Sequence, residues 1–276
     1  MTELLRIENL TITPASQPQR RLVNGVSFSI DAGRTACVVG ESGSGKSLTA
    51  LSVMGLLPNA LHRPSGTIRF QGQELTTLSN VDLQGIRGKR IGMIFQEPMT
   101  SLNPVLTVGY QIGESLAVHL GLSGKALKER ISALLEQVGI PPSRAGSYPD
   151  ELSGGQRQRV MIAMAIACEP AMLIADEPTT ALDGTVQAQI LKLLADLKSR
   201  MNMGMLFITH DFGVVADIAD DVVVMFRGEI VESGPVAQVL GHPQHPYTRA
   251  LLDCVPDADG KKALKPIDYA WLQESA

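Results

Sequence analysis

Aromatic side chains, cysteines and long apolar runs are all scarce in this sequence of 276 residues. Aromatic residues make up only 4% of the chain although 44% is hydrophobic, so the core must be built mainly from aliphatic side chains. The longest apolar run, residues 160–168, has nine residues, whereas a helix that spans a membrane needs about 20. We therefore expect a soluble chain that reaches a membrane only through partners.

The cysteine count and the charge balance exclude two further classes of protein. The three cysteines, Cys37, Cys168 and Cys254, include no close pair, which favours a reducing compartment without a disulfide framework. A formal charge of -4 argues against nucleic-acid binding, because tight sequence-independent binding needs a basic surface. The first residues lack the basic start and apolar run of a signal peptide, so none is expected.

The length suggests one large domain, or one domain with an inserted subdomain. Strand patterns and helix patterns alternate along the chain, which predicts a mainly parallel sheet covered by helices on both faces. A helical segment extends from residue 107 to 139, where Ile131, Leu134, Leu135 and Val138 share one helix face. The predicted strands are 4–12, 26–30, 35–39, 66–70, 171–175, 205–209 and 222–226, and the other predicted helices are 47–57, 156–168 and 186–199.

A glycine-rich loop follows the strand predicted at 35–39 and precedes a predicted helix. Residues 40–47 match the phosphate-loop pattern G-x4-G-K-[ST]. Its glycines let successive backbone N–H groups turn toward phosphate oxygens, and the helix adds the positive end of its dipole. The predicted phosphate-binding residues are Gly40, Ser42, Gly43, Ser44, Gly45, Lys46 and Ser47, with the Ser47 hydroxyl available to Mg²⁺.

A second element places two acids at the end of an apolar strand. Asp176 and Glu177 follow the strand predicted at 171–175. Beside a phosphate loop, the first acid lies near Mg²⁺ and the second near the attacking water. Glu177 is therefore the candidate general base.

A third element is a short glycine-containing stretch before a predicted helix. Residues 152–156 (Leu-Ser-Gly-Gly-Gln) precede a helix, and Ser153 is well placed as its N-cap. This sequence resembles the signature motif of ABC ATPases. The resemblance continues in order through Gln96 (Q-loop), residues 181–183 (D-loop) and His210 (switch histidine). It implies a P-loop ATPase core with a mainly parallel sheet, an N-terminal antiparallel β subdomain and an inserted α-helical subdomain.

The resemblance also implies roles for the matching residues. The family works as a head-to-tail dimer, in which the phosphate loop of one chain and the signature of the other enclose each ATP. Ser47 and Gln96 would bind Mg²⁺ directly, and Asp176 would reach it through water. His210 would contact the γ-phosphate of the same chain. The signature residues Ser153, Gly154, Gly155 and Gln156 would hold the nucleotide bound to the opposite chain, and Asp183 would join the two sites.

Three further stretches resemble the dipeptide, oligopeptide and nickel importer branch, namely residues 96–104, 178–189 and 245–252. This branch implies a peripheral ATPase on the cytoplasmic face of the cell membrane. Its partners would be a second ATPase, which favours a heterodimer, two membrane permease subunits and an external solute-binding protein. The loop after Gln96 and the helical insert would contact the membrane subunits. Cys254 stands alone after position 168, so no iron–sulfur cluster is expected.

The resemblance covers roughly residues 3–256 and departs from the family at one point. No aromatic residue lies between Ile12 and Val26 to stack on adenine, so Arg20 or Arg21 is the candidate in its place. Phe28 is in phase with Val26 and Ile30 and is predicted to belong to the core.

Several alternatives stay open. The cargo can be a peptide, a nickel chelate or another small solute, and a non-transport ABC ATPase is a further class. A single ATPase domain over 1–276 is expected, with a helical insert at 97–156 and a C-terminal extension at 241–276. The end of that extension, including Trp271, either packs on the core or a partner or is unstructured.

Overall fold

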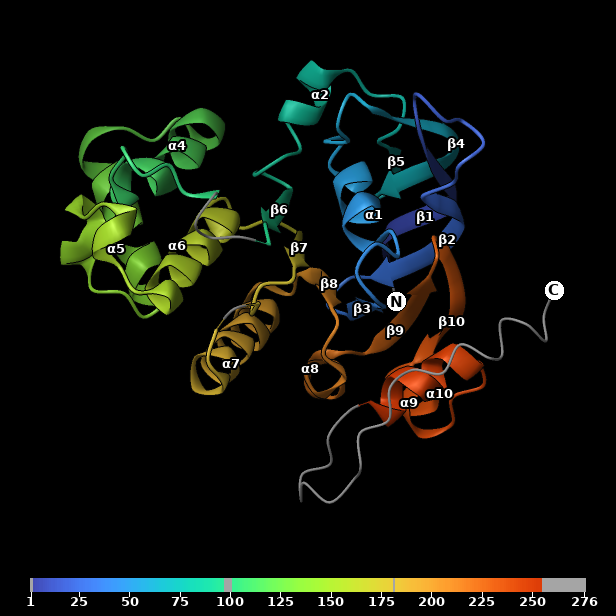
Figure 1. The fold of residues 1–276 in the computed structure, drawn as a ribbon. Coiled ribbons are helices and arrows are strands. Elements are labelled where there is room, and N and C mark those ends of the chain that lie inside the picture. The colour runs from blue at the N-terminus through green and yellow to red at the C-terminus, as the bar shows by residue number, and fades with distance from the viewer. Residues whose placement is uncertain (1, 97–100, 181, 255–276) are drawn as a thin grey trace. The chain divides into compact units, whose positions relative to one another are not determined.

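The computed structural model describes residues 2–96, 101–180 and 182–254. The chain forms two compact units. The first consists of Met1–Thr76 together with Leu206–Ala276, and the second is Thr77–Met205. Figure 1 follows the chain from the blue N-terminal strands through the green and yellow helices to the orange and red C-terminal elements. The predicted C-terminal tail beyond residue 254, with Trp271, lies outside the described residues.

An antiparallel sheet with the strand order β2-β1-β4-β5 forms the N-terminal part of the first unit. Its strands are β1 (Glu3–Pro14), β2 (Val23–Asp31), β4 (Leu61–Phe70) and β5 (Gln73–Glu74). Leu5, Ile7 and Ile68 are buried on one face. This sheet confirms the antiparallel β subdomain that the sequence implied.

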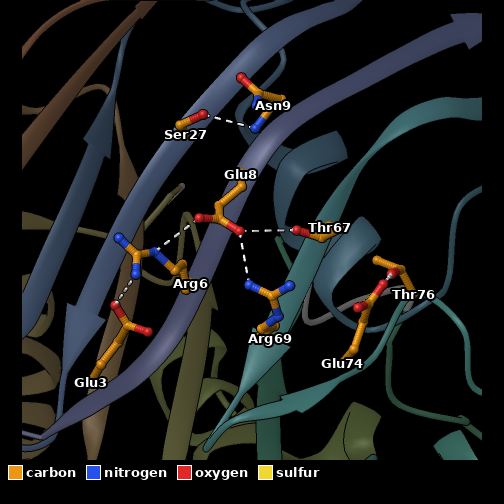
Figure 2. A network of polar contacts seen from close by, with 9 residues as sticks. All are labelled: Glu3, Arg6, Glu8, Asn9, Ser27, Thr67, Arg69, Glu74 and Thr76. Atoms are coloured by element: carbon orange, nitrogen blue, oxygen red, sulfur yellow. Dashed lines mark hydrogen bonds and ion pairs between the residues drawn. The ribbon is translucent and has the colours of Figure 1, made fainter.

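The opposite face of this sheet carries a network of charged side chains (Figure 2). The carboxylate of Glu8 accepts hydrogen bonds from Arg69 at 3.0 Å and from Thr67 at 3.2 Å, and it pairs with Arg6 at 3.3 Å. The Glu8, Arg6 and Arg69 side chains are between 39% and 49% exposed. Exposed pairs of this kind contribute about 0–1 kcal/mol each, so the network marks the solvent face rather than stabilising the fold strongly.

A second group of strands in the first unit has the order β10-β9-β3-β8. β3 (Thr35–Val39) pairs in parallel with β9 (Asp221–Phe226), and β10 (Glu229–Pro235) returns antiparallel to β9. β8 (Gly204–Thr209) begins at the boundary between the two units. The helices of this unit are α1 (Lys46–Val53), α8 (Phe212–Ile218), α9 (Val236–Gly241) and α10 (Pro246–Asp253).

The second unit combines a parallel strand pair with a group of helices. β6 (Ile91–Ile94) runs parallel to β7 (Met172–Asp176). The helices are α2 (Asn80–Gln84), α4 (Val108–Leu120), α5 (Gly124–Gln137), α6 (Gly154–Ile166) and α7 (Gly184–Met201), with short 3-10 turns η1 (Pro142–Gly146) and η2 (Pro149–Glu151). Within residues 2–96, 101–180 and 182–254, no helix combines the length and the apolar character that crossing a membrane requires.

The patterns of buried aliphatic residues predicted most strands correctly. The strand at 35–39 has the predicted bounds, and those at 205–209 and 222–226 each begin one residue earlier. The four residues predicted to share a helix face, three in α5 and Val138 directly after it, are all buried. Phe28, in contrast, is only half-buried on β2, so its prediction as a core residue was only partly correct.

Two of the predicted elements differ most from the observed ones at one end. The helix predicted at 47–57 ends at Val53, because Gly55 adopts a left-handed φ of 61° and its N–H donates to the Ser52 carbonyl. The strand predicted at 66–70 begins at Leu61, because pairing with β1 extends it through Pro64.

The regular alternation of buried and exposed residues that is typical of a half-buried strand fails in β1 beyond Glu8. Asn9 has a φ of 50°, and the pairing register with β2 shifts between Ile7 and Leu10. A β-bulge of this kind changes which side chains face the core. As a result Leu10, Thr11 and Ile12 are buried in succession.

Candidate active site

The phosphate loop occupies the turn between β3 and α1, as the sequence predicted. Gly40 has a φ of 147°, and a Cβ there would lie 2.1 Å from the Met225 carbonyl oxygen. Gly45 has a φ of 100°, and a Cβ there would meet the Leu22 carbonyl oxygen at 2.9 Å. Both positions need glycine, because any side chain would collide with neighbouring backbone.

The Lys46 side chain is folded back onto its own loop. It is only 5% exposed. Its Nζ donates to the carbonyl oxygens of Gly40 at 2.7 Å and Glu41 at 2.8 Å, with the Ser44 hydroxyl at 3.4 Å. A buried ammonium needs acceptors of this kind to offset the loss of water. The loop therefore holds its cation in place before any anion binds.

Space for an anion lies on the concave side of the loop. A cavity of about 150 Å³ is lined by four loop residues, 41–44, together with Phe226 and Arg227. In the described part of the chain, the backbone N–H groups of Ser42 and Gly43 have no hydrogen-bond partner. No side chain caps the N-terminus of α1. Donors left unpaired beside a helix N-terminus are suited to phosphate.

Two contacts from the C-terminal part of the first unit hold the loop from outside. The Gly228 N–H donates to the Ser44 carbonyl at 3.1 Å. The Glu41 N–H donates to the Tyr247 hydroxyl at 3.0 Å. Sequence reasoning missed both. The stretch around Tyr247 had been noted only for its resemblance, and a backbone contact such as that of Gly228 leaves no trace in a sequence.

The two acids of the second unit have different surroundings. Asp176 is the last residue of β7 and only 6% exposed. Glu177 has a left-handed φ of 47°, a strained conformation for a residue with a side chain, and such strain clusters at functional sites. Its Oε2 accepts hydrogen bonds from the Gln96 amide at 3.3 Å and the Thr180 hydroxyl at 2.9 Å. The structure thus brings Gln96 and Glu177 together, and it adds Thr180.

The signature residues form the start of α6. The Ser153 hydroxyl accepts from the Gln156 N–H at 3.3 Å, and the Gln156 side chain accepts from the Ser153 N–H at 3.0 Å. This reciprocal capping box confirms Ser153 as the N-cap. A Cβ on Gly155 would lie 2.7 Å from Cγ1 of Val186, so glycine allows α6 to pack closely on α7.

Two other predicted residues occupy the ends of secondary-structure elements. The Asp183 carboxylate accepts from the Val186 N–H at 2.9 Å and caps α7, a local role that the sequence analysis did not predict. His210 follows the end of β8 and is exposed. Asp183 thus lies where α7 begins and His210 lies where β8 ends. Residue 181 of the D-loop and residues 97–100 lie outside the described residues.

The family profile of ABC transporters matches residues 23–180, more than half of the chain. The chain belongs to the ABC transporter family. A second profile, for the C-terminal region of oligopeptide/dipeptide transporters, matches residues 231–271. The chain is therefore an ABC ATPase, and the predicted family and fold class are confirmed.

Known relatives agree with this assignment. The oligopeptide transport ATP-binding protein OppD of Bacillus subtilis is 49% identical over 273 residues, which cover 97% of this chain and 76% of OppD. The glutathione import ATP-binding protein GsiA of Escherichia coli is 50% identical over 281 residues, covering 97% of this chain but only 44% of GsiA. Among solved structures, the dimeric ATP-binding cassette MJ0796 bound to ADP and Pi is 27% identical, with a TM-score of 0.75 over 84% of this chain and 99% of that one.

The prediction for adenine stays open in this ABC ATPase. The Arg21 guanidinium donates to the Asn24 side chain at 2.6 Å. Asn24 in turn donates to the Glu229 carboxylate. A guanidinium held in this way presents a planar face, but none of these contacts tests whether adenine stacks on Arg20 or Arg21.

Proposed function

We propose that this ABC ATPase energises the import of peptides or related small solutes. The observation that carries the proposal is the match of residues 231–271 to the C-terminal region of oligopeptide/dipeptide transporters, in the same chain as the ABC transporter match at 23–180. The relatives OppD and GsiA are named for oligopeptide transport and glutathione import. Import of nickel or another small solute is the alternative.

The proposed energy source is ATP-driven closure of a head-to-tail dimer. The MJ0796 cassette, similar over 84% of this chain, is dimeric with ADP and Pi bound. In the present chain the start of α6 is exposed around Ser153, as a surface that meets a second chain must be. Since the Ser153 hydroxyl accepts one hydrogen bond in its cap, its own proton is still available to a phosphate. Ser153, Gly155 and their neighbours would therefore serve the partner's nucleotide.

The phosphate groups of ATP would bind at the loop of residues 40–47. Ser42 and Gly43 offer backbone donors, and Gly43 has open space where a Cβ would be. Lys46 would exchange its carbonyl acceptors for phosphate oxygens, which carry full negative charge and form stronger hydrogen bonds. Lys46 would therefore change its hydrogen-bond partners when the nucleotide binds.

The residues assigned to Mg²⁺ suit that ion chemically. Ser47, Gln96 and Asp176 all present oxygen atoms, the ligands that Mg²⁺ prefers. Asp176 is buried and can only accept hydrogen bonds when ionised, which suits a carboxylate next to a cation. The bound ion would supply charge neutralisation for the phosphates.

Glu177 would act as the general base for the attacking water. Its carboxylate accepts hydrogen bonds from Gln96 and Thr180, so two donors orient it. The same contact links the base to the Q-loop. His210, at the end of β8, would contact the γ-phosphate, and Asp183 would join the two sites of the dimer.

The partners would be a second ABC ATPase, two membrane permeases and an external solute-binding protein, with this chain on the cytoplasmic face of the cell membrane. A heterodimer is the favoured pair. The second unit offers a surface for the permeases, since α4, α5 and η1 enclose an apolar cavity of about 810 Å³. Tyr110 and Val118 lie at this cavity with 61% and 72% of their surface exposed.

The experiment is reconstitution of the chain with the products of neighbouring genes in liposomes. ATP turnover would be measured with the external binding protein either empty or loaded with a pool of short peptides. We expect stimulation by the loaded protein. A parallel preparation with Glu177→Gln should bind ATP and lose nearly all turnover. Unstimulated turnover would move the cargo to nickel or another small solute, and normal turnover of Glu177→Gln would refute the assigned base.

A further inference from the structure

Helix α10 contacts the phosphate loop through the side chain of Tyr247. Tyr247 lies in the first turn of α10 and is 0% exposed. Its hydroxyl oxygen accepts a hydrogen bond from the Glu41 N–H at 3.0 Å. Glu41 follows the first glycine of the loop and lines the anion cavity. This hydrogen bond joins α10 to a loop 206 residues away in the sequence.

The bonded N–H belongs to the same peptide group that holds Lys46. The peptide bond between Gly40 and Glu41 presents its carbonyl oxygen to Lys46 Nζ at 2.7 Å and its N–H to Tyr247. A peptide group is planar, so its two polar ends cannot rotate independently. The tyrosine hydroxyl thus fixes the plane that carries the lysine's acceptor. If this plane rotated, both hydrogen bonds would break together.

Tyr247 is itself held at its ring and at its backbone. Its ring packs on Phe226 with centroids 4.3 Å apart. Its N–H donates to His245 Nδ1 at 3.1 Å, which caps α10. The residues before α10 are anchored in turn, because the Glu232 carboxylate accepts from the N–H groups of Gln244 at 2.8 Å and His245 at 3.0 Å. Because both the ring and the backbone of Tyr247 are held, its hydroxyl can fix the orientation of the loop.

We propose that Tyr247 is a positioning residue for nucleotide binding, which orients the Gly40–Glu41 peptide so that the loop and Lys46 are preorganised for phosphate. The inference rests on nucleotide binding at the loop of residues 40–47. It gives the C-terminal region matched at 231–271 a direct part in the ATPase site. Preorganisation acts on affinity, because a loop already in its binding conformation does not have to be ordered by the ligand.

The test compares Tyr247→Phe with Thr248→Val in the full chain. The first variant keeps the ring and removes the hydroxyl. The second removes a buried hydroxyl from the next residue of the same helix and leaves the Glu41 contact intact. We expect Tyr247→Phe to raise the KM for MgATP and the Kd for ADP by roughly five- to tenfold, with kcat within about twofold. Thr248→Val should leave both constants unchanged, whatever it does to the unfolding temperature.

Two results would overturn the proposal. One is unchanged nucleotide affinity in Tyr247→Phe, and the other is a loss of affinity in both variants that simply follows their loss of stability. Amide hydrogen exchange in the unaltered protein gives a check that needs no variant, since the Glu41 N–H should exchange more slowly than that of Ser42. Equal exchange at the two amides would also refute the proposal. Lys46→Ala separates this from the underlying function, because retained affinity there would show that the nucleotide does not bind at this loop.

Discussion

The N-termini of α1 and α6 are both suited to anions, but α1 has no side-chain cap whereas α6 is capped. At α1 no side chain caps the helix, and the preceding loop leaves the N–H groups of Ser42 and Gly43 without partners in the described structure. At α6 the reciprocal bonds of Ser153 and Gln156 cap the helix. The first helix start is buried around Lys46, whereas the second is exposed at Ser153.

The difference in capping suits the two helix N-termini to different roles in binding an anion. Unsatisfied helix donors are stabilised by an anion, so the start of α1 gains most from a ligand. The start of α6 is already capped, so an anion would stabilise it less. This suits a surface that has to be stable in the single chain and would contact a nucleotide only in the proposed dimer. In the proposed dimer, one chain would therefore contribute the phosphate loop of one nucleotide site and the signature residues of the other.

The largest effect should come from removing the cation at α1. Lys46→Ala should weaken ATP binding by about 100-fold, because hydrogen bonds to charged groups contribute about 1.5–3 kcal/mol each. Isothermal titration with ATP and Mg²⁺ measures this. Lys125→Ala, at a lysine whose side chain is 90% exposed on α5, is the matched control and should bind normally. An equal loss in both variants would mean that general charge, not the loop, attracts the nucleotide.

An intermediate effect is expected at the α6 cap. Ser153→Ala should lower the unfolding free energy by about 1 kcal/mol and reduce ATP turnover by about tenfold while leaving nucleotide affinity unchanged. Ser79→Ala is the control, because Ser79 forms the same kind of capping box with Asp82 at α2. It should lose similar stability and keep its turnover. If turnover fell equally in both, the serine at α6 would be only a cap.

The smallest effect is on the pH dependence of stability. It should concern the elements that hold the phosphate loop and not the cap of α6. Burial lowers the pKa of His245 below its ordinary value of 6.5, although Glu232 opposes the shift. His245 Nδ1 must be unprotonated to cap α10. The unfolded chain therefore binds the proton more readily, and stability present above about pH 6.5 falls as the pH drops below it. The Ser153 and Gln156 cap contains no group that titrates in this range.

Urea unfolding between pH 7.5 and 5.5 measures this effect. The loss should stay below about 1 kcal/mol, because a pKa difference of one unit corresponds to about 1.4 kcal/mol and His245 is partly exposed. His245→Asn keeps a capping acceptor and should flatten the pH dependence, whereas His242→Asn should not. Burial raises the pKa of Glu232, but hydrogen bonds from Gln244, Thr248 and His245 outweigh it and lower that pKa overall, so that group titrates below this window. An unchanged slope in His245→Asn would contradict the assignment.

Local sequence was sufficient for much of this fold and site. The phosphate loop, the two acids at the end of β7 and the cap at Ser153 depend on residues close together in the chain, so their chemistry and spacing can be read directly. The buried strand β3 is a continuous apolar run, and its bounds were predicted. Elements without such a pattern were missed, including β6, with four residues, and the helices α8, α9 and α10.

Tertiary structure decided what depends on distant residues. The length of β4 and the burial of successive residues in β1 follow from pairing register and a bulge at Asn9. The left-handed backbone of Glu177 and its contact with Gln96, 81 residues away in sequence, arise only after folding. The same holds for the hydrogen bond that joins Tyr247 to the Glu41 amide across 206 residues. The sequence by itself determined which groups can bind phosphate, because this depends on residue type and local spacing. Only the folded chain decided what holds those groups in place, because a hydrogen bond between distant residues leaves no local pattern.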